Sequence, residues 1–120
     1  MKKFLVSLRH GFNGIRYAVS SERNIKIQLA AFALVMAAGF GLDIPKLEML
    51  AILGMSALVL SLELTNTAVE QLADRVSPEQ DAQIRIVKDV VAGAVLVASL
   101  FAAVIGLLVF LPPLLRLLRG

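Results

Sequence analysis

The chain has 120 residues, enough for one small domain, and carries a net charge of +3. It is 58% hydrophobic, whereas soluble domains contain roughly 45–50% apolar residues, so an ordinary soluble globular protein is excluded. The absence of cysteine excludes a disulfide framework and a thiolate metal site, and the single histidine, His10, cannot supply a multi-histidine zinc site. The basic residues lie beside apolar stretches, which favours anionic lipid over nucleic acid as their partner. We therefore predict an all-α integral membrane protein with no nucleic-acid partner.

Residues 2–20 are predicted to form an amphipathic helix on the membrane surface. Apolar residues recur here at spacings of three and four, which places them on one helical face: Phe4, Leu5, Leu8, Phe12, Ile15 and Val19. Arg9-His10-Gly11 interrupts the apolar run and no small-residue cleavage site follows, which argues against a signal peptide. A helix in the headgroup plane is the better interpretation.

Three apolar stretches are each long enough to cross a bilayer as a helix. Their predicted limits are about residues 25–42, 47–74 and 85–111. Together with residues 2–20 they form one membrane-embedded domain that covers residues 1–120.

Turn and capping residues predict where these helices begin and end. Ser20-Ser21 is expected to cap the helix of the first span, and Ser77-Pro78-Glu79 is expected to open the helix that leads into the third. Pro112-Pro113 is expected to end that helix and leave Leu114–Gly120 as a short tail.

The distribution of basic residues predicts the orientation, because cytoplasmic segments are enriched in lysine and arginine. One side holds those before the first span and those between the second and third: Lys2, Lys3, Arg9, Arg16, Arg23, Lys26, Arg75, Arg85 and Lys88. The other side holds only Lys46, Arg116 and Arg119. The N-terminus is therefore expected in the cytoplasm.

A polar stripe at the end of the second span is the strongest indication of function. At about 100° per residue, Glu63, Glu70 and Asp74 fall within roughly 20° of one line on a helix, and Asn66 lies on the same face. Acidic groups in a membrane-spanning helix need a pathway, a partner or a bound cation. Of these, a cation explains the stripe most economically.

Ionisable groups from the other two spans are expected at the same depth as this stripe. Glu22 lies at the start of the first span, and Lys88-Asp89 at the start of the third, level with Glu70. Carboxylate and amide oxygens suit Mg²⁺, and a lysine beside them suits a polyphosphate such as ATP. These groups indicate phosphoryl transfer, with the deeper Glu63 placed to accept a proton from a hydroxyl within the membrane.

Each of these residues also has a purely structural explanation. Glu22 suits the first turn of a helix dipole, and Asp74 suits a solvated helix end beside Arg75. Lys88 and Asp89 suit an interfacial anchor with its counter-charge, and Glu63 and Asn66 suit a hydrogen bond between helices. Lys3 and His10 suit contacts with lipid headgroups.

The motif Glu63-Leu-Thr-Asn-Thr-Ala-Val-Glu70-x-x-x-Asp74, followed by Lys88-Asp-x-x-Ala-Gly-Ala-Val-Leu96, resembles the bacterial diacylglycerol kinase/undecaprenol kinase family. Glu22-Arg-Asn-x-Lys-Ile and Gly106-Leu-Leu-Val-Phe-Leu-Pro112 resemble its Gram-positive branch, whose members are mainly undecaprenol kinases. The resemblance implies a homotrimer of three-span protomers in the bacterial cell membrane. It also implies active sites shared between subunits, in which MgATP phosphorylates a lipid alcohol at the cytoplasmic interface.

The resemblance also implies roles for individual residues. Glu63 resembles the general base, Asn66 an essential polar residue, and Glu22 and Glu70 the ligands of magnesium and ATP. Lys88-Asp89 resembles the pair that contacts phosphate and nucleotide.

Three further positions match the family less closely. Lys3 and His10 fall where the family has N-terminal nucleotide contacts. Glu79–Asp81 falls where a loop closes over the nucleotide, but the sequence of that loop differs here.

We therefore predict an ATP-dependent lipid kinase that phosphorylates undecaprenol, with diacylglycerol as the alternative substrate. An alternative of another class is a small proton-coupled exchanger that uses Glu63. Such exchangers usually have four spans and a single mid-membrane carboxylate, whereas this chain has three spans and clusters its acids at one interface. A purely structural subunit would leave the acidic stripe unexplained.

Overall fold

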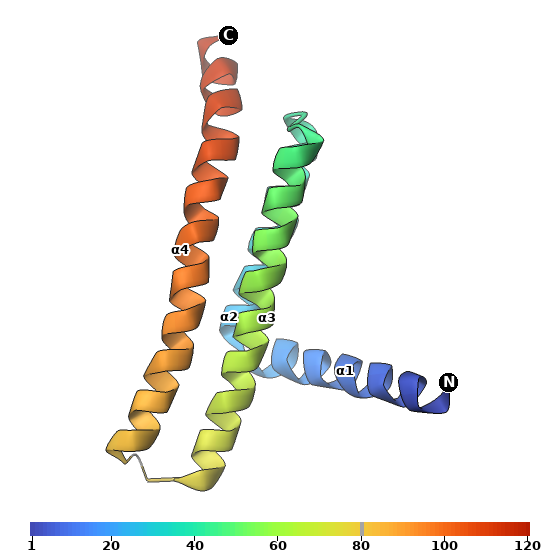
Figure 1. Cartoon of the computed structure of the whole chain (residues 1–120). Helices are drawn as coiled ribbons and strands as arrows, with labels where there is room; N and C mark the ends of the chain where they lie inside the picture. Colours follow the sequence, from blue (N-terminus) through green and yellow to red (C-terminus); the bar gives the residue numbers. More distant parts are fainter. Residues whose placement is uncertain (80) are drawn as a thin grey trace.

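A computed structural model of the chain describes residues 1–79 and 81–120, and it confirms the all-α prediction. Four helices make up the fold in the described residues (Figure 1). Their bounds are α1 Lys2–Ser21, α2 Arg23–Gly41, α3 Lys46–Val76 and α4 Ala82–Arg119.

The last three helices are long and apolar enough to cross a membrane. Their most apolar segments have mean hydropathies of 1.4 in α2, 1.9 in α3 and 2.9 in α4. Helix α3 has 31 residues. At about 1.5 Å per residue it is roughly 46 Å long, whereas a bilayer core is about 30 Å thick. One end of α3 must therefore project toward water, and its last turns carry Glu70 and Asp74.

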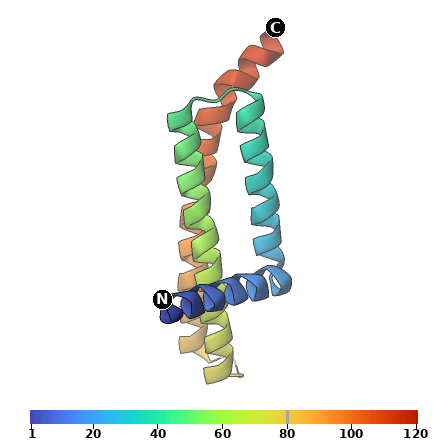
Figure 2. The same cartoon turned by 90° about the vertical axis from the view of Figure 1, so that its right-hand side faces the viewer.

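The helices form a narrow bundle with one arm. Helices α3 and α4 run antiparallel and pack along each other, and α2 packs against α3 (Figure 1). Helix α1 runs out sideways from the other three helices (Figures 1 and 2). The chain thus turns a sharp corner between α1 and α2.

That corner is made by Glu22, and the predicted serine cap is wrong. Glu22 has an extended backbone (φ −110°, ψ 119°) and is the N-cap residue of α2. The Ser20 hydroxyl instead donates a hydrogen bond to the Tyr17 carbonyl, at 2.9 Å within α1. An N-cap residue needs a non-helical backbone, and Ser20 and Ser21 still belong to α1, so the cap position falls to Glu22.

The predicted start of the helix of the third span is also wrong. Ser77 ends α3 in an extended conformation, and its hydroxyl donates to the Glu79 carbonyl. The N-cap of α4 is Asp81, whose Oδ1 accepts from the backbone N–H groups of Gln83 (2.6 Å) and Ile84 (3.2 Å). An aspartate that satisfies two free N–H groups outcompetes a serine that is already engaged. Residue 80 of the predicted loop lies outside the described residues.

Helix α4 does not end at Pro112-Pro113, contrary to prediction, but continues to Arg119. A proline removes one helical hydrogen bond while its ring holds φ near the helical value, so a helix can pass through it with a bend. The C-terminal end of α4 indeed leans away from the bundle (Figure 2). The residues expected as a tail are therefore helical.

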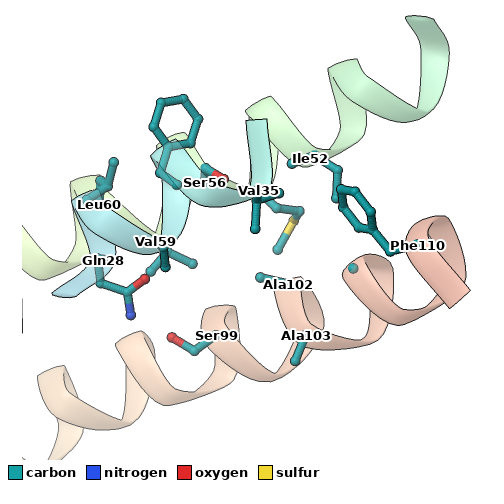
Figure 3. A pocket seen from close by; sticks show the side chains of 14 residues that line it. Gln28, Val35, Ile52, Ser56, Val59, Leu60, Ser99, Ala102, Ala103 and Phe110 are labelled. Carbon is teal, nitrogen blue, oxygen red and sulfur yellow. The ribbon is translucent and has the colours of Figure 1, made fainter. Parts of the chain in front are cut away.

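The interior of the bundle is sparse, and most large apolar side chains are exposed. An apolar cavity of about 360 Å³ lies between α2, α3 and α4, with Gln28 and Ser99 pointing into it (Figure 3). None of the predicted site residues lines this cavity. Near the other end of α2, Gly39 is buried against the Met49 side chain, which closes the α2–α3 packing.

The N-cap of α4 provides a test of the fold. Substituting Asp81→Ala should cost about 1 kcal/mol of local helix stability and speed hydrogen exchange at the amides of Gln83 and Ile84. Ser77→Ala is the matched control and should leave those amides protected. Equal exchange in the two variants would show that Asp81 does not cap α4.

Candidate functional site

The deepest member of the polar stripe, Glu63, is buried inside the bundle. Its side chain is only 6% exposed although it lies on a membrane-spanning helix. Thr67, one turn later, is also buried and donates to the Glu63 carbonyl at 3.1 Å, so that hydroxyl is satisfied within α3. The Glu63 carboxyl group has no hydrogen-bond or ion-pair partner among the described residues. The residue is thus nearly enclosed while its carboxyl oxygens are open and unpartnered, so they are free to accept a proton from a bound substrate.

Asn66 and Glu70 lie next to each other on the same face of α3. The Asn66 amide donates to Glu70 Oε1 over a long 3.5 Å, and its own Oδ1 is buried without a partner. A buried carbonyl oxygen that lacks a donor is costly unless a ligand completes it. The pair therefore offers carboxylate and amide oxygens that are only partly satisfied.

A small cavity near the connection between α3 and α4 holds the charged groups. Glu70 from α3 and Arg85, Lys88 and Asp89 from α4 line this cavity of about 300 Å³. Cations and carboxylates thus occur together around one opening. That combination suits an anion that carries its own metal ion, as a nucleotide polyphosphate does.

An ion pair joins the two helices beside this cavity. The Lys88 ammonium lies 2.5 Å from Asp74 Oδ1, with the lysine side chain 24% exposed and the aspartate 62% exposed. Such an exposed pair contributes roughly 0–1 kcal/mol, so Lys88 can leave Asp74 for a phosphate at little cost. Asp74 is thus a largely exposed residue near the end of α3 that pairs weakly with the lysine beside the cavity.

Glu22 reaches the same region from the α1–α2 corner. Glu22 and Glu70 are the charged groups whose fields act on Glu63. The structure therefore brings Glu22, Glu63 and Glu70 into one neighbourhood. Glu70 links this group to Asn66 by a hydrogen bond and to Lys88 and Asp89 by the cavity they line together, whereas Glu22 does not line that cavity.

Lys3 and His10 do not join this group within one protomer. Both are exposed on α1, which carries the N-terminus away from α3 and α4 (Figure 1). Neither residue lines the α3–α4 cavity.

The residues present fit a shared magnesium ion better than a self-contained metal site. Within residues 1–79 and 81–120, no three of the histidine, aspartate and glutamate side chains are arranged to hold a metal. Magnesium is usually bound through one or two protein carboxylates together with substrate phosphates. The carboxylates of Glu22 and Glu70, with the unpartnered Asn66 oxygen, meet that requirement.

Arg85 is a residue that the sequence reasoning counted only for membrane orientation. It lies three residues before Lys88, so both side chains fall on one face of α4 and both line the cavity. The spacing was available as a signal in the sequence. The spacing of Arg85 and Lys88 indicates a cavity only once Glu70, from α3, is seen to face them.

Comparison with known proteins extends this picture to the whole chain. Residues 9–110 match the prokaryotic diacylglycerol kinase family. The chain is 34% identical over 114 residues to the undecaprenol kinase of Bacillus subtilis (strain 168), covering 95% of this chain and 93% of that protein. It is 36% identical over 115 residues to a diacylglycerol kinase of Synechocystis sp., covering 95% of this chain and 66% of that protein. With three apolar helices and this match over most of its length, the chain belongs to the prokaryotic diacylglycerol kinase family of membrane lipid kinases.

Proposed function

We propose that the protein is an ATP-dependent undecaprenol kinase of the bacterial cell membrane. It transfers the γ-phosphoryl group of ATP to the lipid hydroxyl and yields undecaprenyl phosphate. The observation that carries this proposal is Glu63, a buried residue with an unpartnered carboxyl group, on the helix that also brings Glu70 to the charged cavity it lines with Lys88. A base in the apolar phase beside an anion site in the aqueous phase is what a kinase with a lipid acceptor requires.

The reaction follows from this placement. Glu63 accepts the proton of the lipid hydroxyl while the oxygen of that hydroxyl forms a bond to the γ-phosphorus. The bond between that phosphorus and the β–γ bridging oxygen breaks, and ADP leaves. Lys88 and Asn66 orient the phosphates, since positioning and charge neutralisation supply most of the catalysis in phosphoryl transfer. Asp89 contacts the nucleotide from the next position of α4.

Magnesium is the metal that the donor set suits. Glu22 and Glu70 would hold the ion together with the phosphates. When bound, the ion neutralises phosphate charge. The unpartnered Asn66 oxygen supports a cationic ligand at this place.

The N-terminus and the site are proposed to face the cytoplasm. The support is the excess of lysine and arginine on the side that carries α1 and the α3–α4 connection. Helix α1 is proposed to lie on that surface, because Phe4, Leu8 and Phe12 expose an apolar face along it.

We further propose a homotrimer whose active sites are shared between subunits. Within one protomer Lys3 and His10 lie on an arm that points away from the cavity (Figure 1), so a nucleotide contact by either residue requires a neighbouring subunit. The many exposed apolar side chains of α2 and α4 and the open cavity between the spans leave surface for such neighbours.

We propose undecaprenol rather than diacylglycerol as the substrate, because the chain spans 93% of the Bacillus undecaprenol kinase but only 66% of the Synechocystis diacylglycerol kinase. Purified protein with MgATP should show a higher kcat/KM for undecaprenol than for diacylglycerol in matched micelles. The opposite ranking would assign the protein to diacylglycerol. Turnover of neither lipid would reject the proposed function.

Substituting Glu63→Gln should lower kcat by about 10²–10⁴-fold, because the amide cannot accept the proton. The measurement is ATP-dependent lipid phosphorylation, with size-exclusion chromatography to verify that the oligomer is intact. Glu48→Gln, at the exposed first turn of the same helix, is the control and should keep full activity. Normal turnover by Glu63→Gln would remove Glu63 as the base.

Substituting Glu70→Gln should raise the magnesium concentration needed for half-maximal activity by about tenfold or more, since one charged ligand is lost. Activity is titrated with Mg²⁺ at fixed ATP, and Glu48→Gln again serves as the control. An unchanged magnesium requirement would contradict the role of Glu70.

A further inference from the structure

A second cavity lies at the corner between α1 and α2. It has a volume of about 680 Å³, is widely open, and is lined by residues of both helices. Glu22, Glu63, Glu70 and Lys88 do not line it. It is therefore separate from the α3–α4 cavity.

The charged groups of this corner cavity are both cationic. Arg16 from α1 and Lys26 from α2 line it, and no carboxylate does. Neither cation forms an ion pair within residues 1–79 and 81–120, where the pair between Lys88 and Asp74 is found instead. Two unpaired cations brought together from perpendicular helices attract an anion of matching charge.

The other side chains identify the anion as part of a lipid. Phe12, Ile15 and Val19 supply an apolar wall, whereas Asn13 supplies an amide donor on the side of Arg16. The Ser20 hydroxyl also lines the cavity, but its proton is donated to Tyr17. A molecule that fits must combine an anionic head for three nitrogen groups with an apolar stem for the wall.

The cavity is also placed at the right depth for a headgroup. Lys26 lies one turn into α2, and α2 is apolar from residue 29 onward as far as residue 42. A headgroup held by Lys26 would therefore have its chain running along α2 into the bilayer. Long basic side chains at such a position reach the phosphate level of the membrane.

We propose that the α1–α2 corner binds the phosphomonoester headgroup of a lipid, which is the chemical class of the product of this kinase. A phosphomonoester carries about −1.5 to −2 charges and three acceptor oxygens at neutral pH, which matches two cations and an amide. A phosphodiester lipid carries a single negative charge and leaves one cation unmatched. The inference rests on the proposed function only in that the product is a lipid phosphate.

The site gives the product a place to move after transfer. Once the metal and ADP have left, the negative charges of Glu22 and Glu70 no longer favour the phosphorylated lipid, and a corner of opposite charge lies nearby. Lys26 is four residues after Glu22 on the same helix, so the transfer is short. The kinase therefore holds its product at the membrane surface beside α1.

The test measures lipid binding to the full-length protein in detergent by native mass spectrometry, without ATP. The probes are phosphatidic acid, a phosphomonoester, and phosphatidylglycerol, a phosphodiester with similar chains. Phosphatidic acid should bind the wild-type protein about tenfold more tightly than phosphatidylglycerol. The double substitution Arg16→Gln/Lys26→Gln should weaken phosphatidic acid binding by about tenfold or more.

The matched control is Lys2→Gln/Arg9→Gln, which removes two charges from α1 outside the cavity and should retain the preference. Equal binding of the two lipids by the wild type, or equal loss in both double variants, would overturn the inference and indicate general attraction of anionic lipid. Because no turnover is involved, this failure is distinct from a failure of the kinase assay.

Discussion

Ionisable groups in a membrane-spanning helix are expensive unless another group or a ligand compensates them. In helix α3 this free-energy cost falls on Glu63, a buried residue whose carboxyl group has no hydrogen-bonding partner among the described residues. The rest of the protein is arranged around that position. Helix α4 brings Lys88 to the end of the stripe, and the corner at Glu22 brings a further acid from the first span. Each element serves to make a charged, water-facing end on an otherwise apolar bundle.

The site has one part near water and one part within the apolar region of the bundle. The α3–α4 cavity, with Glu70, Lys88 and Asp89, lies where a soluble nucleotide can arrive. Glu63 lies deeper, where a lipid hydroxyl can arrive and bulk water is scarce. In the proposed reaction the two partners meet along the axis of one helix, at the level where α1 is proposed to lie on the membrane surface.

Much of this arrangement could be read from the sequence, because helical periodicity determines which residues share a face. The stripe on α3 and the shared depth of Glu22, Glu70 and Lys88 follow from spacing and hydropathy alone. The errors concern local competition for backbone groups. Ser20 and Ser77 were expected to cap helices, but each hydroxyl bonds elsewhere, and Asp81 caps α4 instead. Arg85 gained significance only when α4 was seen beside Glu70. The α1–α2 corner cavity could not be predicted from the sequence either, because it depends on how the two helices are oriented to each other.

The continuity of α3 has a consequence for how such an enzyme tolerates change. Glu70 lies seven positions after Glu63, so an unbroken helix fixes their axial offset at about 10 Å and their angular offset at about 20°. Inserting a single residue between them would swing one carboxylate about 100° around the axis. A lengthened loop elsewhere would leave both untouched. The continuous helix thus fixes the spacing of the two carboxylates. Changes of length at the ends of the molecule are tolerated far more easily than changes of length between Glu63 and Glu70.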